Sequence, residues 1–208
     1  MMKFRIYHTP YFLRLFYRRD ATWQIKTDKK ELFLTFDDGP TTEMTQWILD
    51  TLKLYNAKAT FFCVGENVKN NPEIYNQIIM EGHAIGNHTY NHLNGLKTND
   101  EEYIKNVSEA KEYIDSPLFR PPYGRIKRSQ FKRIQNLGYR IILWSILSYD
   151  FDKNLNREKA WKQIVKHTKP VSIIVFHDNI KAFDNLKVLL PKTLDYFSQM
   201  GYSFKILD

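Results

Sequence analysis

The chain has 208 residues, of which 43% are hydrophobic, 15% aromatic and 26% charged, and its formal net charge is +8. This length supports one substantial core and is short for two domains, and the aromatic content excludes a disordered chain because so many rings must be buried or used at a site. The basic charge would suit an acidic partner, but no cluster of about five to eight lysines and arginines occurs, so no nucleic-acid partner is expected.

Residues 1–30 are expected to form an N-terminal arm that packs on a main domain spanning 31–208. The arm mixes aromatic and basic residues, and Arg14 interrupts its only candidate for a signal-peptide core. No run of about 18 apolar residues exists, so no transmembrane segment is predicted. Peripheral membrane contact of the arm is the alternative to packing on the domain. We therefore expect a cytoplasmic location by default, with non-standard export or membrane-surface association as alternatives, and no protein partner.

From residue 31 onward, short apolar runs alternate with longer amphipathic stretches, which is typical of repeated β/α units. The pattern predicts strands near 32–36, 59–64, 84–87, 117–120, 140–144, 172–176 and 203–206. It predicts helices near 43–56, 72–82, 100–115, 127–137, 157–168 and 184–200. Helix starts are indicated at Pro72 and around Asn99, and helix ends at Gly82, Gly138 and Gly201. About seven such strands favour a mostly parallel sheet that closes, or nearly closes, into a barrel.

Ionisable residues directly follow several of the predicted strands. They are Asp37 and Asp38 after the first strand, His88 after the third, Arg120 after the fourth and His177 after the sixth. In barrels of parallel strands, the chemistry lies at the carboxyl ends of the strands, which share one rim. Chance would scatter such groups over both ends, so the pattern predicts an active site at this rim.

A metal site is indicated by two histidines and a pair of carboxylates. His88 and His92 are four residues apart, which places both imidazoles on one face if the local backbone is helical. Such a pair alone is more often a surface or core pair. Asp37 and Asp38 change this interpretation, because one carboxylate can complete a two-His, one-carboxylate site while the other takes a proton from water. This ligand set suits Zn²⁺ as the default ion and also accepts Co²⁺, Ni²⁺ or Fe²⁺.

Four segments resemble, in order, the motifs of the polysaccharide deacetylase (NodB-homology) family, carbohydrate esterase family four. They read TFDDGP at 35–40, HTYNH at 88–92, RPPYG at 120–124 and VFHD at 175–178. The resemblance implies an α/β fold with a distorted (β/α) barrel. It also implies a metal-dependent hydrolase that removes N-acetyl groups from amino sugars of a glycan such as peptidoglycan or a chitin-like oligosaccharide. The alternatives are a deacylase for a lipid-linked formamido sugar, an acetyl ester or a cyclic amide, and a non-catalytic carbohydrate-binding relative.

The resemblance also implies roles for the residues of the first three motifs. Asp38, His88 and His92 would hold the ion. Asp37 would act as the general base, and Arg120 would pair with it. A guanidinium beside the carboxylate would fix its orientation and keep it ionised, with a bidentate fork that lysine could not reproduce.

By the same resemblance, His177 would be the general acid that protonates the departing amine. Asp150 would orient His177 and raise its pKa, with Asp152 and Asp178 as alternatives for that role. No site role is expected for the histidines outside these motifs, His8, His83 and His167.

The substrate-binding residues expected from the resemblance are Tyr123, Pro122, Phe151, Trp144 and Val175. The backbone N–H of Tyr123 would help to stabilise the oxyanion. Trp144 could line the groove or belong to the core. The sequence departs from the common family pattern at Phe151 and Leu147, where Trp and Asp are usual. Phe151 still offers an apolar wall for an acetyl methyl group.

Overall fold

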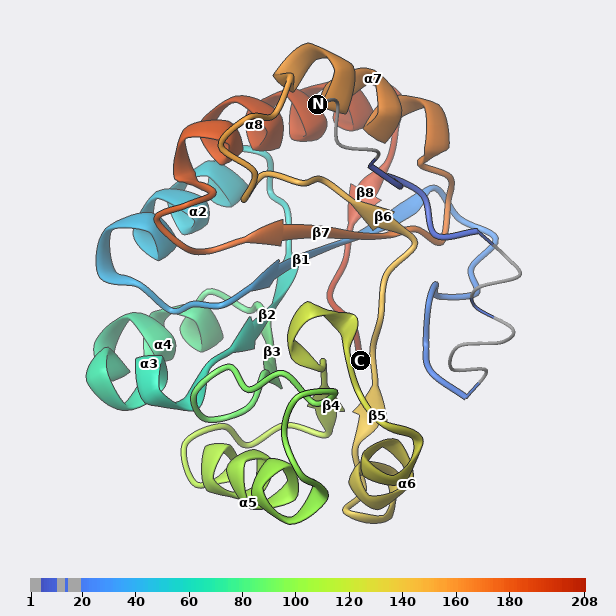
Figure 1. Ribbon diagram of the computed structural model, residues 1–208. Coiled ribbons are helices and arrows are strands. Elements are labelled where there is room, and N and C mark those ends of the chain that lie inside the picture. Colours follow the sequence, from blue (N-terminus) through green and yellow to red (C-terminus); the bar gives the residue numbers. More distant parts are fainter. Residues whose placement is uncertain (1–4, 11–13, 15–19) are drawn as a thin grey trace.

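The computed structural model describes residues 5–10, 14 and 20–208. Within them, parallel strands form a curled sheet in the order β5-β4-β3-β2-β1-β7-β6, and β8 pairs with the start of β1 (Figure 1). The strands are β1 (Glu31–Asp37), β2 (Ala59–Cys63), β3 (Ala84–Asn87), β4 (Leu118–Phe119), β5 (Arg140–Ile141), β6 (Ile146–Leu147), β7 (Ile173–His177) and β8 (Ser203–Phe204). The predicted fold class, an α/β barrel-like sheet of mostly parallel strands, is confirmed.

Helices surround the convex side of this sheet (Figure 1). They are α2 (Thr42–Leu54), α3 (Gly65–Asn70), α4 (Pro72–Met80), α5 (Asp100–Lys111), α6 (Arg128–Asn136), α7 (Arg157–His167) and α8 (Phe183–Gln199), with a 3₁₀ turn η1 (Pro122–Gly124). The helix signals in the sequence act as predicted: Pro72 begins α4, and the Asn99 side chain accepts a hydrogen bond from the Glu102 N–H at the start of α5. Gly82 and Gly138 follow their helices with φ of 75° and 88°, which glycine adopts without steric cost.

Two short elements were not predicted. The stretch predicted as one strand over 140–144 is β5 alone, and the chain then forms β6 after a break. The helix α3 has only six residues, too few for a helical period to show in the sequence.

The alternation of side chains along β1 sets up the site. Leu34 and Phe36 pack in the large core that the helices cover, where Phe36 stacks on Phe61 and Phe176 with ring centroids 5.0 and 6.0 Å apart. Phe33 belongs to a separate cluster with residues of β2, β4 and β7. Because every second residue of a strand shares a face, Thr35 and Asp37 lie on the same face as Phe33. The interior face of β1 is therefore apolar at its start and polar at its carboxyl end.

The described part of the N-terminal arm lies across the two edges of the sheet. His8 bridges antiparallel to Ile146 of β6, and Thr22 bridges parallel to Ile142 just beyond β5. In the part of the chain that the structure describes, no ladder joins β5 to β6, so the arm covers the opening between them. Residues 1–4, 11–13 and 15–19 of the predicted arm lie outside the described residues. None of the described helices is long and apolar enough to cross a membrane.

Candidate metal and catalytic site

Three predicted metal ligands meet at the carboxyl ends of β1 and β3. Asp38 Oδ1 lies 3.0 Å from His92 Nε2 and 3.5 Å from His88 Nε2, and one ligand atom from each residue falls within 4.8 Å of the others. The helical backbone assumed for the two histidines is wrong. Residues 88–92 form an irregular loop in which Thr89 and His92 have φ of 67° and 61°, and this loop returns His92 to the side of His88.

His88 and Asp38 are held by neighbours that fix the atoms they present. His88 Nδ1 lies 2.7 Å from the carbonyl oxygen of Arg120, which can only accept, so Nδ1 carries the hydrogen and Nε2 is left to bind an ion. Asp38 Oδ2 accepts a hydrogen bond of 2.5 Å from Asn179 Nδ2, and its backbone oxygen accepts one of 2.7 Å from Asn67 Nδ2. Asn67 of α3 and Asn179 were not predicted, because a side-chain amide that supports a neighbour carries no signature in a single sequence.

The charge state of Asp38 suits a cation. Burial raises the pKa of Asp38, but hydrogen bonds with His88 and His92 outweigh burial and hold that pKa well below its usual value. An ionised carboxylate and two imidazoles are the donor set that divalent transition metals prefer. Asp38, His88 and His92 therefore fit a metal ion by both chemistry and spacing.

The predicted base and its partner form a buried ion pair. Arg120 Nη1 donates to Asp37 Oδ1 at 2.6 Å and to Thr35 Oγ1 at 2.7 Å. The guanidinium also faces the carbonyl oxygens of Ile142 and Leu143, at 3.3 and 3.4 Å, and its side chain is fully buried. Arg120 does not line the cavity onto which Asp37 opens, so it can influence a bound molecule only through Asp37. A buried charge pair with all these partners fixes the Asp37 carboxylate in one orientation.

His177 pairs with Asp150. Its Nδ1 lies 2.7 Å from Asp150 Oδ1, and its backbone N–H donates to Asp150 Oδ2 at 2.7 Å. Burial lowers the pKa of His177, but the charge and hydrogen bond of Asp150 outweigh burial and raise it to about 9. Asp152 instead pairs with Arg5, and Asp178 accepts hydrogen bonds from Thr41 and Thr45.

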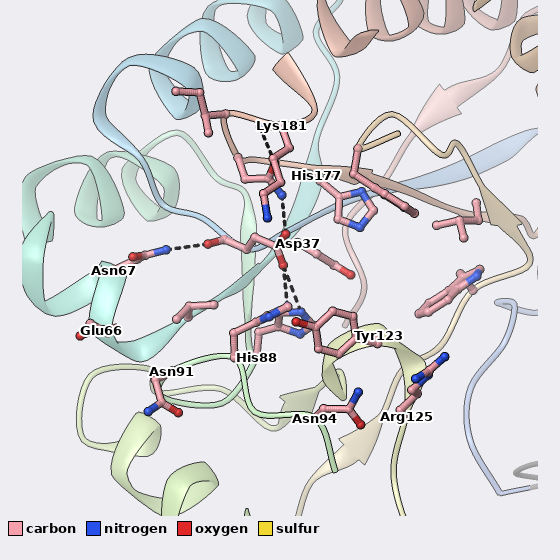
Figure 2. A pocket seen from close by; sticks show the side chains of 18 of the residues that line it. Asp37, Glu66, Asn67, His88, Asn91, Asn94, Tyr123, Arg125, His177 and Lys181 are labelled. Atoms are coloured by element: carbon pink, nitrogen blue, oxygen red, sulfur yellow. Dashed lines mark hydrogen bonds and ion pairs between the residues drawn. The ribbon is translucent and has the colours of Figure 1, made fainter. Parts of the chain in front are cut away.

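These groups open onto one cavity of about 910 Å³ at the carboxyl ends of the strands (Figure 2). Asp37, Asp38, His88, His92 and His177 line it, together with Tyr123, Trp144, Leu147 and Phe151. Figure 2 shows His88 on one side of Asp37 and His177 on the other.

Two predicted substrate contacts lie elsewhere. The Val175 side chain is fully buried in β7 and that of Pro122 is buried in η1, and neither lines the cavity. Trp144 satisfies both interpretations, because it lines the cavity and also packs against the core. The cavity also exposes polar side chains that were not predicted: Glu66, Asn67, Asn91, Asn94, Lys97, Arg125, Asn179 and Lys181.

The histidines outside the motifs have structural surroundings. The buried His83 accepts a hydrogen bond from the Ala59 N–H through Nδ1, and burial lowers its pKa to about 4. His8 and His167 stack with ring centroids 5.4 Å apart. None of the three lines the catalytic cavity.

Comparison with known proteins relates this site to a family. The sequence model described as "Polysaccharide deacetylase" matches residues 24–142. A peptidoglycan-N-acetylglucosamine deacetylase from Bacillus cereus is 35% identical over 190 residues, covering 88% of this chain and 89% of the relative. The peptidoglycan-N-acetylmuramic acid deacetylase PdaA from Bacillus subtilis is 32% identical over 202 residues, covering 91% and 74%.

Solved structures agree with the sequence comparison. A crystal structure of the Bc1960 peptidoglycan N-acetylglucosamine deacetylase shares 33% sequence identity with this chain and superposes on it with a TM-score of 0.80, covering 90% of this chain and 91% of the other. The sequence match spans more than half of the chain, and the fold agrees over most of it. This chain belongs to the polysaccharide deacetylase family.

Proposed function

We propose that this chain is a metal-dependent hydrolase that removes N-acetyl groups from amino sugars of a glycan such as peptidoglycan or a chitin-like oligosaccharide. The observation that carries the proposal is the single cavity in which the group Asp38, His88 and His92 lies with a carboxylate, Asp37, and a protonated histidine, His177. Hydrolysis of an amide needs both a base for the water and an acid for the amine. The relatives named above act on the N-acetyl sugars of peptidoglycan, which supports this substrate class.

Asp37 is assigned the role of general base. Arg120 engages Asp37 Oδ1, so Oδ2 is the atom that would take a proton from the attacking water. The fixed guanidinium balances the charge of the Asp37 carboxylate and prevents it from rotating. A divalent ion held by Asp38, His88 and His92 would polarise the acetyl carbonyl and acidify the water.

His177 is assigned the role of general acid. Asp150 accepts the hydrogen on Nδ1, which leaves the proton on Nε2 to move to the sugar nitrogen. When the C–N bond breaks, the amine keeps the electron pair and that proton, and the acetyl group departs as acetate with the water oxygen. With a pKa of about 9, His177 carries this proton at neutral pH.

The acetyl group itself would be bound by the backbone and by apolar side chains. The resemblance assigns the Tyr123 N–H to the oxyanion, and Tyr123 has a φ of 60° at the cavity edge. Phe151, whose ring lies 4.8 Å from that of His177, would contact the acetyl methyl group together with Leu147 and Trp144.

We propose Zn²⁺ as the ion, with Co²⁺, Ni²⁺ and Fe²⁺ as alternatives that the same donors accept. Stripping the protein with a chelator and adding back each ion, with calorimetric affinity and turnover measured in parallel, identifies it. A single ion that restores turnover and binds at one site per chain supports the assignment. Full turnover in the stripped protein contradicts it.

The central experiment replaces Asp37 with Asn. Asp37→Asn should bind the ion as the wild type does, because all three ligands remain, and should lose turnover by a factor on the order of 10² to 10⁴. Asp195→Asn, which makes the same chemical change on the exposed side of α8, is the matched control. Unchanged acetate release by Asp37→Asn would contradict the assigned roles.

A substrate panel tests the glycan. Release of acetate from N-acetylglucosamine oligomers or from peptidoglycan supports the proposal. Release of formate from a formamido sugar, hydrolysis of acetyl esters alone, or opening of a cyclic amide would reassign the same site to another acyl substrate. Glycan binding without turnover in the presence of any of the four ions would make the chain a binding protein.

A further inference from the structure

The loop at 148–154 carries both Asp150 and Phe151, and it is held on one side by the interior of the domain. Ser148 Oγ donates to Asp150 Oδ1 at 2.9 Å, and Asn185 Nδ2 of α8 donates to the Asp150 backbone oxygen at 2.7 Å. These contacts fix Asp150 from within. Phe151, in contrast, is 37% exposed, and its ring meets His177 at a centroid distance of 4.8 Å.

The outer side of the same loop is held by the N-terminal arm. The Ile6 N–H donates to the Tyr149 hydroxyl oxygen at 3.0 Å, and that hydroxyl lies 3.3 Å from the Ile6 carbonyl oxygen, which can accept its hydrogen. The Tyr7 ring contacts the Tyr149 ring edge to face at 5.1 Å, and the Tyr7 carbonyl accepts the Leu147 N–H at 2.9 Å. Tyr149 has a φ of 59°, a conformation that side chains rarely adopt unless neighbours hold it.

Arg5 fixes the far end of the loop. Its Nη2 and Nε donate to Asp152 Oδ2 at 2.6 and 3.1 Å, and Nη2 also donates to the Asn154 carbonyl at 3.2 Å. The two paired side chains are only 16% and 13% exposed, so this contact is shielded from solvent better than a surface ion pair. The residues on both sides of Asp150, namely Tyr149 and Asp152, are therefore each bonded to the arm.

We infer that the arm segment 5–7 is a positioning element of the active site, with Arg5 as its main positioning residue: it fixes the loop that places Asp150 and Phe151 against His177. None of the four sequence motifs includes this segment, and the three residues of the metal group follow β1 and β3 and do not belong to the loop that the arm contacts. The inference rests on the proposed function, because His177 must be held to act as the acid. Small displacements of a positioned group are costly, since about 1 Å can reduce a rate on the order of a hundredfold.

The test compares Arg5→Ala with Arg133→Ala. Arg133 makes a similar two-bond pair with Glu101, at 2.6 and 3.0 Å, but on α5 and α6. Arg5→Ala should lower kcat per metal-loaded site on the order of tenfold, with KM and metal affinity within about twofold of wild type. Arg133→Ala should leave all three unchanged. Arg5→Lys should fall between wild type and Arg5→Ala, because lysine keeps the charge and loses the second bond.

Hydrogen exchange gives a readout that does not depend on turnover. The His177 backbone N–H is protected by Asp150 Oδ2, so Arg5→Ala should speed exchange in peptides covering 148–154 and His177, and Arg133→Ala should not. If the wild type releases no acetate from any substrate, the proposed function fails and exchange alone decides the inference. Unchanged exchange in Arg5→Ala, or a kcat per site equal to that of Arg133→Ala in an active protein, overturns it.

Discussion

Replacing Asp150 with Asn tests how His177 keeps the proton that the proposed reaction needs. In the folded protein, burial lowers the pKa of His177, and the Asp150 carboxylate, with smaller contributions from Asp38 and Asp37, raises it to about 9. Asn is nearly isosteric with Asp but removes the charge that raises this pKa most, so the pKa of His177 should fall toward its ordinary 6.5. The acid should therefore lose its proton within the working pH range.

The size of this effect depends on pH. With a pKa of about 9, roughly 90% of His177 is protonated at pH 8, whereas with a pKa of about 6.5 only about 3% is protonated. At pH 6 the protonated fractions are close to 100% and about 75%. We expect Asp150→Asn to lose on the order of thirtyfold in kcat at pH 8 and much less at pH 6, with the alkaline limb of the profile moved to lower pH.

The assay is the pH profile of kcat for metal-loaded protein between about pH 5.5 and 9.5. This range includes both pKa values of His177, about 9 in the wild type and about 6.5 expected in the variant. Ser148→Ala is the control, because it removes the two hydrogen bonds between Ser148 Oγ and Asp150 and keeps the carboxylate, so its alkaline limb should stay in place. Two N–H groups of His177 bond to the two oxygens of Asp150, and Asn offers only one oxygen beside its N–H₂. One of the two bonds is therefore lost, which costs about 1–3 kcal/mol of stability. An alkaline limb in Asp150→Asn that coincides with that of wild type would refute the reasoning.

Two further predictions concern side chains that support Asp37 and Asp38. Arg120→Lys should lower kcat and reduce the free energy of unfolding by about 3 kcal/mol, measured by urea denaturation. Lysine has a single side-chain nitrogen, so it cannot replace the bonds from Nε and Nη2 to the carbonyl oxygens of Ile142 and Leu143 while it also holds Asp37. Wild-type stability and turnover in this variant would contradict the buried-pair argument. Asn179→Ala should weaken metal affinity by about 10- to 100-fold, because it removes the hydrogen bond that holds Asp38 Oδ2. Calorimetric titration measures this change, and an unchanged dissociation constant would show that the amide does not support Asp38.

The extent to which the sequence predicts the fold follows from element length. β1 and β7 are apolar runs of five or more residues, and the sequence locates them to within a residue or so. β6 has two residues, and its existence depends on pairing with β7 on one side and with the arm at His8 on the other. Such a strand is fixed by contacts distant in sequence, which local periodicity does not contain.

The site shows a similar division. The groups that carry charge, Asp37, Asp38 and His177, lie at or just after the carboxyl ends of β1 and β7 and were predicted from that position. The proximity of His88 and His92 was predicted from a helical spacing that the loop does not have, so the structure brings the two residues together for a different reason. The supports for these groups include the side-chain amides of Asn67 and Asn179 and the carbonyl oxygen of Arg120, and such atoms have no pattern of their own in a sequence.

The backbone of Asp38 bears on which residues could replace it. Its φ is 83°, in the left-handed region, and its carbonyl is held there by Asn67. Glycine, asparagine and aspartate enter this region at least cost, whereas longer side chains pay about 1–2 kcal/mol. Glutamate carries the same carboxylate and is an equally good metal ligand, yet the backbone conformation at this position disfavours it whether or not an ion is bound. The choice of aspartate at this position is thus determined jointly by coordination chemistry and by the steric limits of one peptide unit.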